Sequence, residues 1–516
     1  MLLAGYAHAL SLAWPFKTSL AWMPAYGQPL WALQLAALAL LVWRLRSAAS
    51  ARAGGWLGWL FATAMLVGTF WWLFISLHYY GGLPAPITVL AVLALALGLG
   101  LYYAFAAAAF VAMAPRPAWA RALLFASCWL LAELARVRLF TGFPWGEGGY
   151  AHIDGWAKPL AAYIGVHGLT FTAAAVASLL ACCAGSLKRR WLPALGLVAG
   201  SWALAALPPA TSAQAPARPA LEVTLLQGNI PQEEKFQGGT GVADALTFYG
   251  QQLMNSRSSL VVLPETAIPL LPHQLDQSYW ATLQARFASG NQAALIGLPL
   301  GSFTEGYTNS VLGFKPGAAS YRYDKHHLVP FGEFIPPFFK WFTRMMNIPL
   351  GDFNRGAVGQ PSFEWQGERL APNICYEDLF GEELGARFTD PASAPTMFVN
   401  VSNIGWFGNS IAIDQHLHIS RMRALEFERP MLRATNTGAT VVIDHAGRVT
   451  ASLERHTRGA LVADVQGSEV MTFYARWVSA WGLLPWLLLC TVVSAFSLVL
   501  ARRRRAADVL RTKALA

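Results

Sequence analysis

Charged residues are scarce in this chain of 516 residues. They make up 13% of the sequence, about half of their usual share in soluble globular proteins. This shortage excludes an ordinary soluble enzyme. The 21 Trp and 29 Phe exclude a disordered chain, because disordered chains contain few aromatic residues. We conclude that much of the apolar surface faces lipid.

Acidic residues are almost absent from both ends of the chain. Residues 1–219 contain 13 Lys and Arg but 3 Asp and Glu, and residues 477–516 contain 6 and 1, whereas residues 220–476 contain 19 and 24. A nucleic-acid-binding protein concentrates basic residues on a folded domain, so we predict no nucleic-acid partner. The basic residues cluster instead in alternate loops between apolar segments, which is typical of the cytoplasmic loops of membrane proteins.

These patterns divide the chain into three parts. We predict a transmembrane helical bundle and linker over residues 1–219, an extracytoplasmic domain over residues 220–476, and a transmembrane helix with a basic cytoplasmic tail over residues 477–516. A helix needs about 20 apolar residues to cross a bilayer. This rule predicts about eight spans, near residues 3–22, 29–43, 57–80, 85–113, 120–138, 159–184, 191–207 and 478–500.

Two charged residues fall at the end of the fifth predicted span. Glu133 is followed by Arg136 one helical turn later. A charge inside lipid is costly and often functional. Near the end of a span, however, two such side chains can pair and reach the membrane surface. We favour the second interpretation.

The pattern of residues 220–476 differs from that of the flanking parts. Short β-rich runs occupy residues 221–226, 260–263, 293–298, 310–314, 370–374, 397–401 and 440–443, and helical patterns occupy residues 244–257, 274–289 and 417–433. Strands that alternate with helices over this length predict a layered α/β domain with its own core.

A second cysteine is missing from residues 220–476. Cys375 therefore has no disulfide partner in its own domain, although an extracytoplasmic compartment favours disulfides. It ends an apolar run directly before polar residues, where a nucleophile is placed at a strand-to-helix turn. The remaining cysteines fall in predicted spans and are interpreted as small apolar residues: Cys128, Cys182, Cys183 and Cys490.

Two other strand ends carry polar residues, and the first of them follows an apolar run. One ends in Pro-Glu-Thr at 264–266, and the other ends in Tyr-Asp-Lys at 323–325 and is followed by Pro-Phe-Gly-Glu at 330–333. Strand ends in open sheets are where such domains build their sites. In this order, followed by Cys-Tyr-Glu at 375–377, the three segments resemble the Glu, Lys, Cys set of the carbon-nitrogen hydrolase (nitrilase) superfamily.

The arrangement of the whole chain resembles the apolipoprotein N-acyltransferase family. The resemblance includes Gln-Gly-Asn-Ile-Pro-Gln at 227–232, Thr-Gly-Phe-Pro-Trp at 141–145 and the segment 400–408, but Phe236 stands where the family often has Trp. It implies an αββα sandwich above a helical bundle in the bacterial cytoplasmic (inner) membrane, with the sandwich on the periplasmic side. It also implies transfer of an acyl chain from a phospholipid to the amino terminus of a diacylglyceryl-cysteine lipoprotein.

The chemistry of acyl transfer assigns a role to each residue of the set. Cys375 attacks as a thiolate, so it needs a base, and Glu265 is the candidate. We expect burial to raise the pKa of Glu265. The attacked carbonyl becomes negatively charged, which requires fixed donors. Lys325 and the backbone N–H of Tyr376 are placed to supply them, and the resemblance implies the same catalytic residues.

Several neighbouring polar residues have supporting or structural interpretations. Glu333 is predicted to hold Lys325 or to orient the base, and Glu377 is predicted to shape the turn at the nucleophile. Asp378 is interpreted as part of a solvated face. The adjacent His326 and His327 lack further ligands at metal-binding spacing, so we predict no metal and no cofactor.

Two aromatic groups are candidates for contact with lipid substrate. Phe339 and Trp341 lie in an apolar segment, which is either an arm that dips into lipid headgroups or a core helix. Trp406 and Phe407 lie in a loop bracketed by glycines, where they either line an acyl groove or pack against the domain.

Three functions compete at this point. The leading prediction is a two-step acyl transfer through a Cys375 thioester in a membrane enzyme of lipoprotein biosynthesis, with a phospholipid donor and a diacylglyceryl-modified lipoprotein acceptor. A membrane-tethered amidase or nitrilase would use the same residues to hydrolyse a carbon-nitrogen bond. A transporter or scaffold with an inactive outer domain would require that the Glu, Lys and Cys set is accidental.

Overall fold

The computed structural model describes residues 1–516 except 184–194, 197, 204–205, 207–218, 336–352 and 516. The chain forms two compact units. One unit comprises Met1–Trp71, Pro86–Pro208 and Leu483–Ala516, and the other comprises Trp72–Ala85 and Pro209–Gly482.

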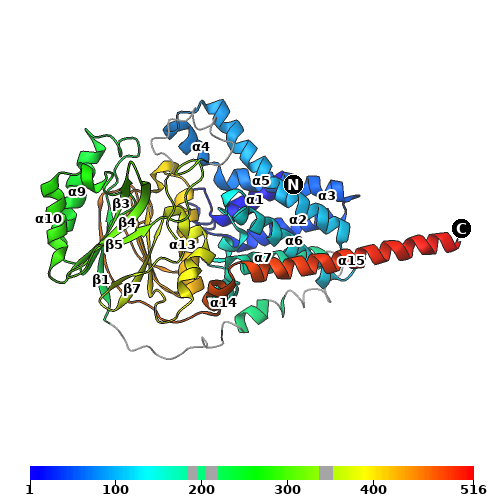
Figure 1. Cartoon of the computed structure of the whole chain (residues 1–516). Helices are drawn as coiled ribbons and strands as arrows, with labels where there is room; N and C mark the ends of the chain where they lie inside the picture. The colour runs from blue at the N-terminus through cyan, green and yellow to red at the C-terminus, as the bar shows by residue number, and fades with distance from the viewer. Residues whose placement is uncertain (184–194, 197, 204–205, 207–218, 336–352, 516) are drawn as a thin grey trace. The chain divides into compact units, whose positions relative to one another are not determined.

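The first unit is a bundle of α-helices (Figure 1). Its principal helices are α1 (Leu2–Leu12), α2 (Trp31–Arg46), α3 (Ala51–Phe70), α5 (Ala85–Met113), α6 (Ala118–Arg138), α7 (Ala161–Cys183) and α15 (Leu484–Leu515). Within the described residues, four helical segments are long and apolar enough to cross a membrane: Ala51–Phe70, Ala85–Met113, Lys158–Cys182 and Leu484–Arg504. The predicted helical bundle is confirmed, and the number of eight spans stays a prediction.

Two of the predicted spans differ from the helices observed. The span predicted over residues 3–22 is wrong in its second half, because α1 ends at Leu12 and no helix follows before Trp31. Pro15 explains this end, since proline disfavours the helical conformation of the residue before it. The span predicted over residues 57–80 is interrupted after Phe70, where the short α4 (Leu73–Ile75) and a π-helix (Ser76–Tyr80) follow. The span predicted over residues 191–207 lies partly outside the described residues, at 191–194, 197, 204–205 and 207.

Glu133 and Arg136 are buried inside the bundle, with side chains that are 1% exposed. Glu133 Oε1 accepts a hydrogen bond from the N–H of Gly148 at 3.0 Å, and Arg136 donates one to the carbonyl of Trp145 at 2.6 Å. The expectation that these side chains reach the membrane surface is therefore wrong. They hold the irregular segment that follows α6, because its backbone polar groups need partners within the bundle.

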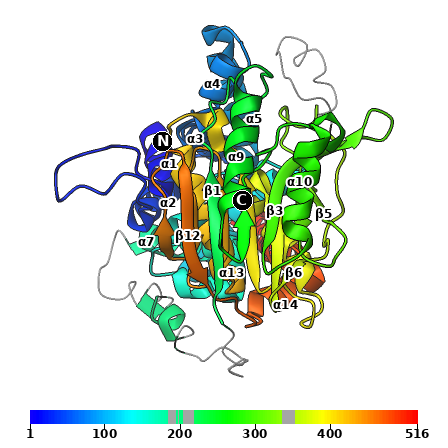
Figure 2. The same ribbon diagram turned by 90° about the vertical axis from the view of Figure 1, so that its left-hand side faces the viewer.

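The second unit contains two six-stranded sheets (Figures 1 and 2). The first sheet has the order β12-β1-β2-β3-β4-β5, and the second has the order β11-β10-β9-β8-β7-β6. The strands of the first sheet are β1 (Leu221–Gln227), β2 (Leu260–Val262), β3 (Ala293–Ser302), β4 (Gly306–Phe314), β5 (Tyr321–Asp324) and β12 (Gly459–Val465). Those of the second are β6 (Phe363–Trp365), β7 (Glu368–Ile374), β8 (Met397–Ser402), β9 (Met431–Thr435), β10 (Val441–Ile443) and β11 (Val449–Ser452).

The two sheets face each other, and helices cover their outer sides. Val223, Leu295, Ile374 and Val399 belong to one buried cluster that joins the inner faces. Helices α9 (Gly241–Asn255) and α10 (Gln277–Ala288) pack over the first sheet, as Figure 2 shows. Helix α13 (Ala412–Phe427) contacts β9 of the second sheet. The predicted αββα sandwich is confirmed.

The helix predicted over residues 417–433 is displaced. Helix α13 begins earlier, at Ala412, and ends at Phe427, where Glu428 adopts a left-handed conformation with φ of 48°. Pro430 follows and cannot continue the helix, because it has no N–H to donate. The chain then enters β9, which places Arg433 on a buried strand instead of a helix.

Strand direction determines where functional residues gather. Strands β1, β2 and β3 run parallel, as do β7, β8 and β9. Glu265 follows β2, Cys375 follows β7, and Asn403 follows β8. Because the carboxyl ends of parallel strands open at the same edge of a sheet, residues distant in the sequence meet there.

Candidate active site

Cys375 occupies a sharp turn between β7 and a short 3-10 helix (Cys375–Leu379). Its φ of 52° lies in the left-handed region, which is costly for a residue other than glycine and persists where the surroundings impose it. Strained backbone of this kind is common at active sites. The turn presents the thiol at the end of the strand, and the residue remains partly exposed.

Glu377 holds this turn against the first sheet. Its Oε2 accepts hydrogen bonds from the N–H of Ile374 and the hydroxyl of Tyr323, both at 2.7 Å. Its Oε1 accepts from the N–H of His326 at 2.7 Å and from that of His327 at 3.2 Å. Burial raises the pKa of Glu377, and these hydrogen bonds oppose the rise. The carboxylate thus connects the segment after β5 to the segment that carries the nucleophile.

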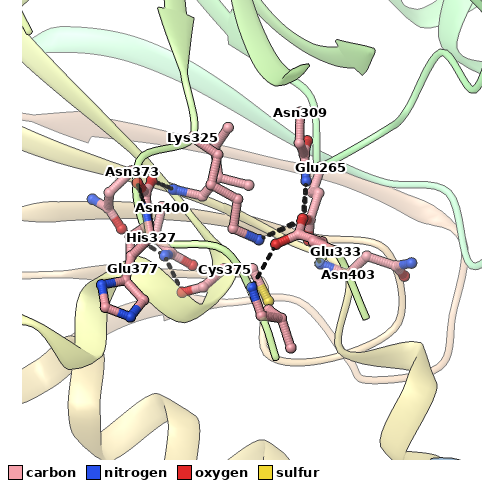
Figure 3. Close-up of polar contacts among 12 residues, drawn as sticks. Glu265, Asn309, Lys325, His327, Glu333, Asn373, Cys375, Glu377, Asn400 and Asn403 are labelled. Carbon is pink, nitrogen blue, oxygen red and sulfur yellow. Dashed lines mark hydrogen bonds and ion pairs between the residues drawn. The ribbon is translucent and has the colours of Figure 1, made fainter. Parts of the chain in front are cut away.

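Glu265, Lys325 and Glu333 form a buried charged group beside Cys375 (Figure 3). The Nζ atom of Lys325 lies 3.3 Å from Oε1 of Glu265 and 2.9 Å from Oε1 of Glu333. The side-chain amide of Asn309 donates to the same two oxygens, each at 2.7 Å. The backbone N–H of Asn403 donates to Oε2 of Glu265 at 2.8 Å. Each of the two carboxylates therefore accepts from both Lys325 and Asn309, and Glu265 is also held through its second oxygen by Asn403.

The charges of this group set the protonation of its members. Burial would raise the pKa of Glu265, but the positive charges of Lys325 and Lys235 and its hydrogen bonds hold that pKa below the ordinary value. Burial acts in the expected direction, but the expected net rise in this pKa is wrong, because the cations and hydrogen bonds outweigh burial. Burial lowers the pKa of Lys325, but Glu265 and Glu333 outweigh burial and raise it. Glu265 is thus ionised and Lys325 is charged.

The thiol of Cys375 is protonated in this resting arrangement. Burial is the largest cause of the rise in its pKa to about 12, the charge of Glu265 contributes to this rise, and Lys325 opposes it. Formation of a thiolate here would require a proton acceptor, and an ionised carboxylate lies nearby. The arrangement supplies a nucleophile, a base and a cationic donor, which are the three components of acyl transfer.

The environment of Asp378, the residue after Glu377, differs from the one predicted. Asp378 is fully buried, so its interpretation as a solvated residue is wrong. Its Oδ1 lies 2.9 Å from Nε2 of His416, which also lies 3.2 Å from the carbonyl of Cys375. Arg433 donates to Nδ1 of His416 at 2.9 Å. Since arginine only donates, Nδ1 of His416 is the acceptor and Nε2 carries the proton. His416 therefore supports the turn through its contact with the carbonyl of Cys375.

The candidate lipid contacts are placed as follows. Phe407 lies against Trp72, with ring centroids 4.3 Å apart, and Trp406 meets Tyr80 edge-on at 5.7 Å. Both aromatic residues of this loop therefore pack against the segment of residues 72–85, and their contact with substrate stays a prediction. Phe339 and Trp341 lie outside the described residues.

Several site residues were missed by the prediction. Asn309 lies within β4 and has no signal in the sequence, because an Asn in a strand is not distinctive. Asn403 and Lys235 lie within or next to the segments 400–408 and 227–232, which were singled out for other reasons. In the part of the chain that the structure describes, no three His, Cys, Asp or Glu side chains are grouped as metal ligands.

The second unit, which contains the sandwich and the buried charged group, belongs to a known class of domain. The family model for carbon-nitrogen hydrolases matches residues 222–473, and that for the apolipoprotein N-acyltransferase N-terminal domain matches residues 16–179. The second unit is thus a carbon-nitrogen hydrolase domain. A solved amidase from Nesterenkonia sp. is 16% identical, covers 52% of this chain and 96% of its own, and has a TM-score of 0.37.

Similarity over nearly the full length identifies the family. An apolipoprotein N-acyltransferase of Verminephrobacter eiseniae is 57% identical over 505 residues, which cover 93% of this chain and 92% of that protein. One of Ralstonia nicotianae is 43% identical and covers 92% and 90%. The chain therefore belongs to the apolipoprotein N-acyltransferase family, and it is a membrane enzyme.

Proposed function

We propose that this enzyme transfers an acyl chain from a membrane phospholipid to the amino-terminal amine of a diacylglyceryl-cysteine lipoprotein. The acyl chain is carried between the two substrates as a thioester on Cys375. One observation supports this proposal most directly: Glu265, Lys325 and Glu333 form a buried, hydrogen-bonded group beside a cysteine on a strained turn.

In the first step, the thiol proton passes to Glu265 as the sulfur attacks the ester carbonyl of the phospholipid. The carbonyl oxygen becomes negative, and the ammonium of Lys325 and the backbone N–H of Tyr376 stabilise it. The tetrahedral intermediate then collapses. The carbon-oxygen bond breaks, the proton on Glu265 passes to the leaving alcohol, and a lysophospholipid departs from the thioester.

In the second step, the lipoprotein amine attacks the thioester and gives its proton to Glu265. The carbon-sulfur bond breaks, the proton returns to the departing sulfur, and an amide is formed. Glu333 positions Lys325 throughout, since its Oε1 is the nearer of the two carboxylate oxygens. A single site thus serves two bulky substrates in turn.

We also propose where the reaction takes place. The alternation of basic loops supports both termini in the cytoplasm and residues 220–476 on the periplasmic side of the bacterial inner membrane. This topology retains the predicted domain boundaries near residues 219 and 476. The thioester would then form on the side of the membrane where exported lipoproteins are found.

The test is the mass of the purified full-length protein after incubation with phospholipid alone. We expect the peptide that contains Cys375 to gain one acyl chain, which hydroxylamine removes. Addition of a diacylglyceryl-cysteine peptide should move that chain to the α-amine of the peptide. Cys375→Ala should lose both steps, and Cys182→Ala is a matched control because Cys182 is a buried thiol in α7. Acyl transfer with Cys375 unmodified would refute the thioester.

The hydrolytic alternative predicts a different product from the same experiment. An amidase would pass the acyl group to water, so free acid would accumulate even when the peptide amine is present. Formation of the peptide amide at the expense of free acid would exclude it.

A further inference from the structure

Lys235 is a buried lysine next to the catalytic group that the steps above do not use. Lys235 is 2% exposed, and its Nζ donates a hydrogen bond to the backbone carbonyl of Glu265 at 3.0 Å. A buried ammonium is costly unless a specific interaction compensates for its lost hydration. The cost points to a role for its charge in the site.

The segment that carries Lys235 is connected to Glu265 by two sets of hydrogen bonds, one through Asn403 and one from Lys235 itself. Gln232 accepts a hydrogen bond from the side chain of Asn403 at 2.8 Å, and the backbone N–H of Asn403 binds Oε2 of Glu265 at 2.8 Å. Lys235 itself binds the main chain of Glu265. The turn of residues 232–236 is thereby held at the catalytic carboxylate, so the position of Lys235 is not accidental.

The balance of charges explains why a second cation is needed. Glu265 and Glu333 share one ammonium, that of Lys325, and one amide, that of Asn309. Two carboxylates that share a site repel each other, and this repulsion raises the pKa of one of them unless another positive charge lies nearby. Lys235 is the second ammonium that acts on Glu265.

We propose that Lys235 is a positioning residue whose positive charge keeps Glu265 ionised, so that Glu265 can accept the proton of Cys375. The proposal rests on the assignment of Glu265 as the base. The groups that face Lys235 from other elements are Glu265 and Cys375, and Glu233 and Glu234 on its own turn are exposed or half-buried. Burial lowers the pKa of Lys235 to about 8, and Glu265 opposes this decrease, so the ammonium is charged at neutral pH.

Two substitutions separate the charge of Lys235 from its hydrogen bond. Lys235→Met removes both, whereas Lys235→Gln removes the charge and keeps a donor. Neither introduces a buried charge, so both variants should fold, and thermal melting checks this. Lys315→Met is the matched control, because Lys315 donates to the carbonyl of Glu364 at the surface.

The rate of Cys375 alkylation by iodoacetamide is measured from about pH 3 to about pH 7 by peptide mass spectrometry on the full-length protein, because the ionisation of Glu265 falls in the acidic part of this range. Without the cation, the pKa of Glu265 rises, so the acidic limb of the rate profile should move to higher pH by about one unit. The rate on that limb then falls about tenfold. We expect both Lys235 variants to show this shift and the Lys315 control to show none. Phospholipid loading of Cys375 should show the same displacement.

Two results would overturn the proposal, and a third would separate it from the proposed function. An unshifted limb in both variants, with or without a uniform loss of rate, would leave Lys235 only a structural role. A wild-type profile in Lys235→Gln with a shifted one in Lys235→Met would assign the effect to the hydrogen bond. Alkylation needs no acyl donor, so a shifted limb in a protein that phospholipid never loads would support the role of Lys235 and refute the phospholipid donor instead.

Discussion

Replacement of Lys325 by arginine tests whether this residue stabilises the oxyanion or serves only as a positive charge. Lys325 is fully buried, and its Nζ already lies 2.9 Å and 3.3 Å from oxygens of Glu333 and Glu265. A guanidinium preserves the charge but directs its planar donors to carboxylates in pairs. It therefore satisfies Glu265 and Glu333 while no single compact donor remains for the substrate oxygen.

The expected magnitude follows from the loss of one oxyanion donor. Such a loss costs about 10² to 10³ in rate, or about 2.7 to 4 kcal/mol in the barrier. Lys325→Arg should therefore load Cys375 at least about a hundredfold more slowly than wild type, with a melting temperature close to wild type. Lys325→Ala should also lose stability, by about 3 to 5 kcal/mol, because it leaves buried carboxylates without their cation.

The assay is the initial rate of thioester formation on Cys375 after mixing with phospholipid vesicles, measured by intact mass. Lys315→Arg is the control for the chemistry of the substitution, since Lys315 binds a surface carbonyl and lies outside the site. Loading by Lys325→Arg within tenfold of wild type would refute the reasoning, because Lys325 would then act as bulk positive charge.

Further outcomes follow from the same structure. Glu265→Gln should fail to load Cys375 because the thiol keeps its proton, and normal loading in the mass assay would refute the base. The pKa of Glu265 is lowered in the folded protein, so its ionisation stabilises the fold above the ordinary glutamate pKa, and this stability is lost as pH falls through the lowered value. The melting temperature of Glu265→Gln should therefore depend less on acidic pH than that of the wild type. An unchanged dependence would contradict this. Trp341→Ser and Phe339→Ser should slow phospholipid use with little change in melting temperature, whereas a large loss of stability with unchanged activity would favour a core helix. A cysteine reporter at Gln214 should react with an impermeant reagent in intact cells and one at Ala506 should not, and labelling at Ala506 would overturn the topology.

The class of protein and the residues of the candidate site were predictable from the sequence for physical reasons. A chain with so few charges cannot cover itself with a polar surface, so a membrane protein follows from composition. Glu265 and Cys375 each follow a strand of apolar residues, Lys325 follows the strand Tyr321–Asp324, and strand ends converge at the edges of sheets. Their order along the chain therefore predicted a site before any distance was known. The limits of the strands were less predictable, and β9 was mistaken for helix because its apolar residues continue the pattern of α13.

The electrostatics of the site were decided by the tertiary structure alone. Whether the pKa of Glu265 ends above or below its ordinary value depends on which cations lie near enough to outweigh burial, and Lys325 and Lys235 come from segments that are remote from it in the sequence. Asp378 looked like a surface residue because acidic residues usually are, yet it is buried with partners that α13 and β9 supply. Residue type and spacing thus determined which groups could react, whereas packing between distant segments determined their charge, because electrostatic interactions depend on separation in space and not along the chain.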